Sequence, residues 1–129
     1  MDSVDFNLLV QETYTESSKL LIIKGGEYAG SEDRLANFKR GAALTGCTPL
    51  QVAFIYASKH YDAVATYVRD SADGTERPRS ESIEGRLDDL LNYAILMKAL
   101  VRESYVRQND ESHVRIDPAS ELGQKLQGA

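Results

Sequence analysis

The hydrophobic residues of this chain recur three or four positions apart, as they do in amphipathic α-helices, and nowhere alternate as in β-strands. In the first segment, Phe6, Leu9, Val10 and Tyr14 follow this spacing. The pattern predicts a helix over about residues 4–24. We expect it to end at the adjacent Gly25 and Gly26, because glycine commonly terminates helices.

Two further helices are predicted before residue 70. A short one over about residues 32–44 carries Leu35 and Phe38, and Gly46 should end it. The sequence Thr48-Pro49-Leu50-Gln51 then combines a capping threonine, a proline at the first helical position and a glutamine placed to complete a capping box. This motif predicts the start of a helix that runs to about Arg69.

The remaining chain contains a loop, one long helix and a tail. Residues 71–79 are polar and include glycine and proline, which predicts a loop. From Ser80 the helical spacing returns and continues to about Gln108. Asp117-Pro118 predicts at most a short helix beyond that point. We therefore expect a single all-α domain over residues 1–108, built as a bundle of four main helices, and a C-terminal tail over residues 109–129.

Composition narrows the class of protein. The chain has 129 residues, enough for one domain with its own core, and a net charge of −5, which argues against binding to nucleic-acid phosphates. It has one cysteine, no apolar run of the roughly 20 residues that a membrane span needs, and no visible secretory signal. We expect a cytoplasmic protein that binds neither nucleic acid nor membranes.

The helix predicted over residues 80–108 is apolar around much more than the usual stripe of about 100°. One chain cannot easily bury all of that surface. We therefore expect a homo-oligomer, a dimer or a tetramer, with the functional site near the subunit boundary.

The start of this last helix contains an unusual concentration of acidic residues. On a helical wheel, Glu81, Glu84, Asp88 and Asn92 form one stripe. Two interpretations remain open for it: a solvated helix face, or a site for Mg²⁺ or Mn²⁺, which prefer hard oxygen ligands. Asp89 falls outside the stripe on a largely apolar side, so it is either buried against a partner or facing a cavity.

Polar residues also interrupt the apolar side of the helix over residues 49–69. Lys59 and Asp62 form either a rim ion pair or a phosphate-binding cation beside a metal-binding carboxylate. His60 is either a hydrogen-bonded structural histidine or a ligand or base. Arg86 and Asp89, on the later helix, are either a buried structural pair or catalytic residues.

Several short motifs, in order, carry a family resemblance over about residues 20–105. The chain is similar to the nucleotide-modification-associated domain family of bacteriophages, which in turn resembles the all-α nucleoside triphosphate pyrophosphatases of the MazG and dimeric dUTPase type. The motifs are Lys24-Gly25-Gly26-Glu27-Tyr28, Asp33-Arg34-Leu35-Ala36-Asn37-Phe38, Lys59-His60-Tyr61-Asp62-Ala63, and Ile83 to Tyr93.

The resemblance implies an oligomeric helical bundle in which carboxylates of two helices hold Mg²⁺ against nucleotide phosphates. Water then attacks the α-phosphorus, and pyrophosphate leaves. The chain departs from this pattern on its earlier helix, where the enzymes carry Glu-x-x-Glu and this chain has Lys59, His60 and Asp62.

The residues matching the resemblance receive the following expected roles. The metal ligands would be Glu84, Asp88, Asp89 and Asp62. His60 or Glu27 would orient the attacking water, and Lys59 and Arg86 would bind phosphates. Beside these roles, Asn37 and Asn92 either bind a base edge or bridge helices. The aromatic candidates for stacking on a base are Tyr28, Phe38, Tyr56 and Tyr93, and the alternative is that the tyrosines are core or interface residues.

Three functions are consistent with these residues. The first is a Mg²⁺- or Mn²⁺-dependent nucleotide pyrophosphohydrolase. The second is a non-catalytic protein that binds or sequesters a nucleotide, for example a signal of host defence, through Lys59, His60 and Arg86. The third is a helical interaction protein whose polar residues fix helix register.

Overall fold

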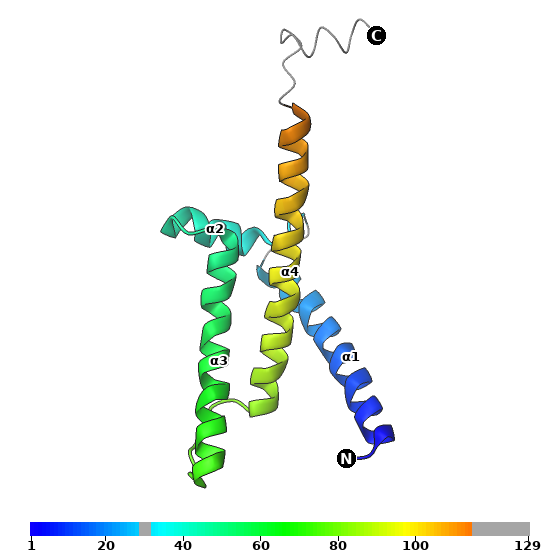
Figure 1. Ribbon diagram of the computed structural model, residues 1–129, viewed down its shortest axis with the longest axis vertical. Helices are drawn as coiled ribbons and strands as arrows, with labels where there is room; N and C mark the ends of the chain where they lie inside the picture. The colour runs from blue at the N-terminus through cyan, green and yellow to red at the C-terminus, as the bar shows by residue number, and fades with distance from the viewer. Residues whose placement is uncertain (29–31, 115–129) are drawn as a thin grey trace, which may run out of the picture.

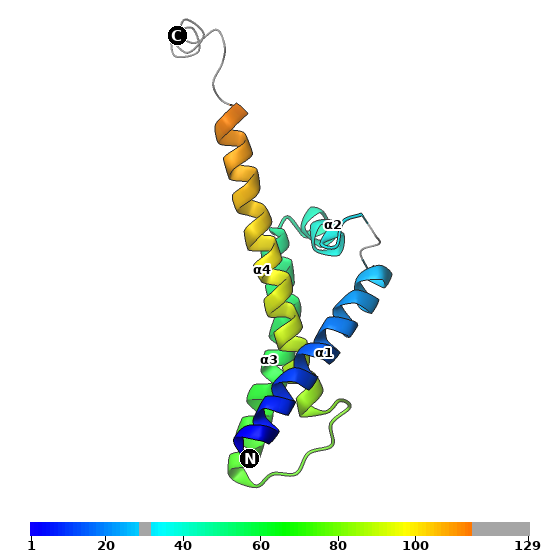
Figure 2. The ribbon, with the colours of Figure 1, turned by 90° about the vertical axis from the view of Figure 1, so that its right-hand side faces the viewer.

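The computed structural model describes residues 1–28 and 32–114, and this part of the chain folds into four α-helices without a strand (Figure 1). They are α1 (Ser3–Tyr28), α2 (Ala36–Thr45), α3 (Pro49–Asp73) and α4 (Ile83–Val114). The predicted all-α class is confirmed. Helices α3 and α4 pack side by side as an antiparallel hairpin, α2 crosses the N-terminal end of α3, and α1 slants away from the hairpin (Figures 1 and 2).

The boundaries set by local capping chemistry match the sequence prediction. The Gln51 amide donates to Thr48 Oγ1 at 3.1 Å, and the Thr48 amide donates to Gln51 Oε1 at 2.8 Å, which completes the predicted capping box. Gly46 ends α2 with a φ of 74°, a conformation that glycine adopts without steric cost.

Three boundaries differ from the prediction. Helix α1 does not stop at its glycine pair but continues to Tyr28. Helix α2 begins at Ala36 instead of residue 32, because Asp33 Oδ1 accepts a hydrogen bond of 3.0 Å from the Leu35 amide and forms a turn before the helix. Helix α3 extends past Arg69 to Asp73, where Gly74 ends it with a φ of 70°.

Helix α4 also differs at both ends. It begins at Ile83, not at Ser80, and Ser82 Oγ accepts a hydrogen bond of 3.0 Å from the Gly85 amide, as an N-capping serine does. It runs to Val114, past the predicted end at about Gln108. The short helix predicted at Asp117-Pro118 lies outside the described residues.

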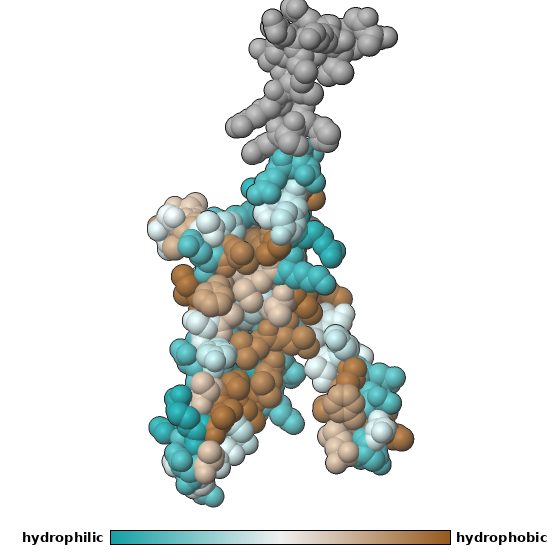
Figure 3. All heavy atoms as spheres, in the orientation of Figure 1, coloured by the Kyte–Doolittle hydropathy of each residue, from teal (hydrophilic) through white to brown (hydrophobic). Residues whose placement is uncertain are grey.

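The buried core is small and lies where α2, α3 and α4 meet. Phe38, only 2% exposed, packs there with Leu35, Val52, Ala53 and Leu100. Away from this junction many large apolar side chains are exposed, and they gather on the visible face of the α3–α4 hairpin and on α1 (Figure 3). None of the helices in residues 1–28 and 32–114 has a stretch long and apolar enough to cross a membrane.

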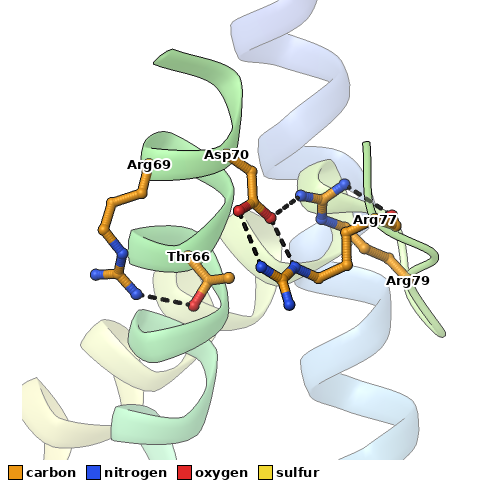
Figure 4. Close-up of polar contacts among 5 residues, drawn as sticks. All are labelled: Thr66, Arg69, Asp70, Arg77 and Arg79. Atoms are coloured by element: carbon orange, nitrogen blue, oxygen red, sulfur yellow. Dashed lines mark hydrogen bonds and ion pairs between the residues drawn. The ribbon is translucent and has the colours of Figure 1, made fainter. Parts of the chain in front are cut away.

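The loop of residues 74–82, which joins α3 to α4, is clamped to α3 by a buried carboxylate (Figure 4). Asp70, 7% exposed, accepts hydrogen bonds from Arg77 Nε at 2.9 Å, Arg77 Nη2 at 3.1 Å and Arg79 Nη2 at 2.9 Å. The hydrogen bond from Arg77 lowers the pKa of Asp70. The Arg79 guanidinium also lies 4.9 Å from the centre of the Tyr67 ring, within cation–π range. These contacts fix the loop that leads to Glu81.

Candidate functional site

A cavity of about 490 Å³ is bordered by residues of all four helices and of the segments that precede α2 and α4. Its volume falls in the roughly 300–1,000 Å³ range of small-molecule sites. The wall consists of Leu20, Leu21, Lys24, Arg34, Asn37, Phe38, Tyr56, Lys59, His60, Glu81, Asp89, Asn92, Tyr93 and Leu96.

Three cationic side chains line this cavity, although the chain as a whole carries a net charge of −5. They are Lys24 from α1, Arg34 from the turn before α2, and Lys59 from α3. Within the described part of the chain, neither lysine forms an ion pair. The cavity therefore has positive charge available for an anion.

Arg34 reaches the cavity by crossing the last turns of α1. Its Nη2 donates a hydrogen bond of 2.6 Å to the backbone oxygen of Leu21. The guanidinium lies directly against Gly25, so that a Cβ at this position would overlap Arg34 Nε. Gly25 thus packs against the Arg34 guanidinium, and it does not end the helix as predicted.

Gly25→Ala is expected to displace the Arg34 guanidinium, because the flexible side chain can move more easily than the helix backbone. Anion binding should weaken about tenfold, which corresponds to the loss of one charge-assisted hydrogen bond, while the protein stays folded.

Gly26→Ala is the matched control, since open space surrounds Gly26. The control should raise the free energy of unfolding by about 0.5–1 kcal/mol, as alanine does in helices, and leave binding unchanged. Chemical denaturation and phosphate titration measure the two effects, and equal binding by both variants would contradict the assigned role.

His60 lies buried in the wall and stands at the centre of a polar network. Its Nδ1 is 3.3 Å from Asp89 Oδ2 and 3.2 Å from Arg86 Nη1, and Arg86 Nε is 3.2 Å from Glu81 Oε2. Burial lowers the pKa of His60, and this effect exceeds the opposing influence of the Asp89 carboxylate. A neutral imidazole can accept the Arg86 hydrogen bond at Nδ1, so His60 and Glu81 both hold the guanidinium.

The lowered pKa of His60 predicts a loss of stability in mild acid. The unfolded chain takes up a proton at His60 near its ordinary pKa of 6.5, whereas the folded chain does so only at lower pH. The free energy of unfolding should therefore fall as the pH is lowered through 6.5 towards the folded pKa. Urea denaturation between pH 5 and 8 tests this against His60→Asn, in which this part of the pH dependence should disappear. A wild-type stability that rises as the pH falls through this window would contradict it.

The same network decides whether a divalent cation fits. Ligand atoms of His60, Glu81 and Asp89 lie within 4.8 Å of one another, close enough to surround an ion. However, the Arg86 guanidinium is already hydrogen-bonded to His60 and paired with Glu81. A divalent cation there would be placed against a fixed cation. The donor set does not fit Mg²⁺ or Mn²⁺ in this arrangement.

The four predicted metal ligands do not lie together. Only Asp89 lines the cavity. Glu84 is exposed and Asp88 half-buried, and neither is part of the cavity wall. Asp62 lines a neighbouring cavity of about 320 Å³ beside the 74–82 loop and, within the described residues, makes no ion pair with Lys59.

Some of the other predicted site residues line the cavity and some do not. Those that line it are Lys59, His60, Asn37, Asn92 and Tyr93. Arg86 is not part of this wall; it is hydrogen-bonded to His60 and lines the neighbouring 320 Å³ cavity. Glu27 is exposed and outside the wall, and the side chain of Tyr28 lies outside the described residues.

Amide and aromatic side chains form the remaining polar part of the wall. Asn92 is 6% exposed, and its Oδ1 and that of Asn37 have no hydrogen-bond partner among the described residues. A buried polar atom without a partner costs about 1–3 kcal/mol. The Tyr93 ring lies 5.6 Å from the His60 ring, and Tyr56 is 6.3 Å from Phe38 and 44% exposed. The two asparagine oxygens therefore offer unused hydrogen-bonding capacity to a ligand.

Sequence reasoning gave no site role to Lys24 or Arg34, although both stand in the motifs that carry the family resemblance. They are ten residues apart on separate elements, so no helical spacing connects them. A search with the chain finds no matching protein-family model, curated protein or solved structure, so the residues and their geometry carry the functional assignment.

Proposed function

We propose that the protein binds a nucleotide in the 490 Å³ cavity through cationic side chains and without a divalent metal. The observation that carries this proposal is the presence of Lys24, Arg34 and Lys59 in one cavity wall of an acidic protein. Such a site selects phosphorylated ligands, because ion pairs and charge-assisted hydrogen bonds strengthen in a partly desolvated pocket.

The two ends of the proposed ligand contact different parts of the wall. Lys24, Arg34 and Lys59 bind the phosphates. The base stacks on Tyr56 or Tyr93 and forms hydrogen bonds with the amides of Asn37 and Asn92, whose amide groups rotate to pair with it. The amide contacts use asparagine oxygens that have no hydrogen-bond partner among the described residues.

The geometry favours binding over hydrolysis. A pyrophosphohydrolase needs carboxylates free to hold a metal beside the phosphates. In this cavity Glu81 is paired with Arg86, Asp89 lies against His60, and the other acidic candidates are outside the wall. We therefore propose a role in binding or sequestering a nucleotide without turnover.

A thermal-shift screen of nucleoside mono-, di- and triphosphates and cyclic nucleotides, each with EDTA and with Mg²⁺, tests this function. A ligand that binds only the folded state raises the melting temperature. We expect a shift that is equal in EDTA and Mg²⁺ and absent with the unphosphorylated nucleoside. No shift with any nucleotide would refute the proposal, and a shift only with Mg²⁺, together with pyrophosphate release, would favour the pyrophosphohydrolase.

We further propose that the protein is a homo-oligomer. The described residues bury only a small core, whereas Phe54, Tyr61 and Val68 on α3 and Leu87 on α4 are at least half exposed. Apolar surface of this extent commonly marks a protein interface.

A further inference from the structure

One side of α4 carries a continuous stripe with the spacing of a packing surface. Its members are separated alternately by four and three residues, so they lie along one line of the helix. Its two central residues are apolar, with Leu91 half-buried and Ile95 41% exposed. The stripe consists of Glu84, Asp88, Leu91, Ile95, Lys98 and Arg102.

The charges of this stripe are ordered along the helix. Two carboxylates, Glu84 and Asp88, precede the apolar centre, and two cations, Lys98 and Arg102, follow it. Within the described part of the chain, none of the four forms an ion pair. The helix dipole accounts for acidic residues in the first turn but not for the cations, which lie in the middle of a helix that continues to Val114. A solvated face would not need Leu91 and Ile95.

We infer that α4 pairs with α4 of a second copy of this chain in antiparallel orientation, with the two-fold axis midway between Leu91 and Ile95. In an antiparallel pair, the acidic end of one stripe lies opposite the basic end of the other. Glu84 then meets Arg102, Asp88 meets Lys98 and Leu91 meets Ile95 of the second copy, and the symmetry repeats each pair. The contact extends over about 27 Å of helix. Charge complementarity therefore identifies a second copy as the partner.

The pairing of the two α4 helices gives Glu84 and Asp88 a role, although neither residue lines the cavity. They lie outside its wall, whereas Asp89, Asn92 and Tyr93 of the same helix line it. Helix α4 would thus present one side to the nucleotide and another to the second subunit.

Two charge-reversed variants test the pairing. Variant A carries Glu84→Lys and Asp88→Lys, and variant B carries Lys98→Glu and Arg102→Glu. Each should repel its own copy, and we expect the dimer dissociation constant of each to rise at least roughly tenfold. An equal mixture of A and B restores every opposite-charge pair, so it should form a heterodimer of wild-type affinity.

Light scattering coupled to size exclusion, at micromolar concentration, gives the masses. Ile22→Glu on α1 is the control, because Ile22 is 74% exposed and outside the stripe, and this variant should remain dimeric. Circular dichroism verifies that all variants keep their helix content, and recovery in the mixture separates repulsion from misfolding. A monomeric wild-type protein, undiminished self-association of A and B, or a mixture that stays monomeric would each overturn the pairing. The pairing rests on the proposed homo-oligomer: a monomeric wild-type protein would refute both, whereas variants A and B that self-associate undiminished would refute the pairing alone. None of these results depends on nucleotide binding, which is tested separately.

Discussion

Replacing both Arg34 and Lys59 with methionine is expected to weaken nucleotide binding by at least about a hundredfold. Both side chains line the cavity, Arg34 from the turn before α2 and Lys59 from α3. Methionine keeps much of their length while removing the charge. A hydrogen bond to a charged group contributes about 1.5–3 kcal/mol, which corresponds to roughly a tenfold or greater loss for each cation. Isothermal titration with the nucleotide that gives the largest thermal shift measures the change.

Lys19→Met is the matched control for this prediction. Lys19 lies on α1 outside the cavity wall, and its side chain is 64% exposed and pairs with Glu16 on the surface. The control should bind the nucleotide like the wild-type protein. The wild-type affinity should also fall with added salt, and the double variant should lose much of this dependence. A double variant with unchanged affinity would exclude these cations from the ligand site.

Asp70→Asn is expected to release the 74–82 loop from α3. Asp70 is the common acceptor for Arg77 and Arg79, and the neutral amide leaves both guanidinium groups without their charged partner (Figure 4). Trypsin cleavage after Arg79 under native conditions should accelerate on the order of tenfold, because cleavage follows the population of the open loop.

Asp73→Asn provides the control for the clamp. Asp73 is exposed at the end of α3 and has no ion-pair partner among the described residues, so the same change there should leave cleavage at the wild-type rate. Because the clamped loop leads to Glu81, Asp70→Asn should also weaken nucleotide binding. Equal protection of the two variants would show that the loop is held by other contacts.

The boundaries that sequence reasoning predicted well are those fixed by neighbouring residues. Thr48, Pro49 and Gln51 determine the start of α3 through bonds made within four residues. The predicted end of α1 was wrong, since the helix continues through Gly25, which packs against Arg34 of another element. The start of α4 was wrong by three residues because Ser82, not Ser80, provides the cap.

The candidate site was only partly predictable, because residues from separate elements form it. Helical periodicity separated Asp89 from the acidic stripe, and the structure places it in the cavity. Periodicity also grouped Glu81 with Glu84, although Glu81 precedes the helix and bonds Arg86. No local pattern shows that Lys24, Arg34 and Lys59 line the same cavity, since three different elements supply them.

Arg86 is the residue that most changes the chemistry expected of this chain. The sequence placed it among carboxylates that resemble a metal site, and the structure shows its guanidinium bonded to Glu81 and His60. A permanent cation paired with Glu81 makes that carboxylate less available to a metal, which supports the proposed binding of phosphates over metal-dependent hydrolysis.

The most direct test of the central claim is isothermal titration of the protein with a nucleoside triphosphate in EDTA and again in Mg²⁺, with pyrophosphate measured in both mixtures. We predict one nucleotide bound per chain, the same affinity in both buffers within about twofold, and no pyrophosphate. Binding that requires Mg²⁺, or pyrophosphate released with it, would contradict the claim.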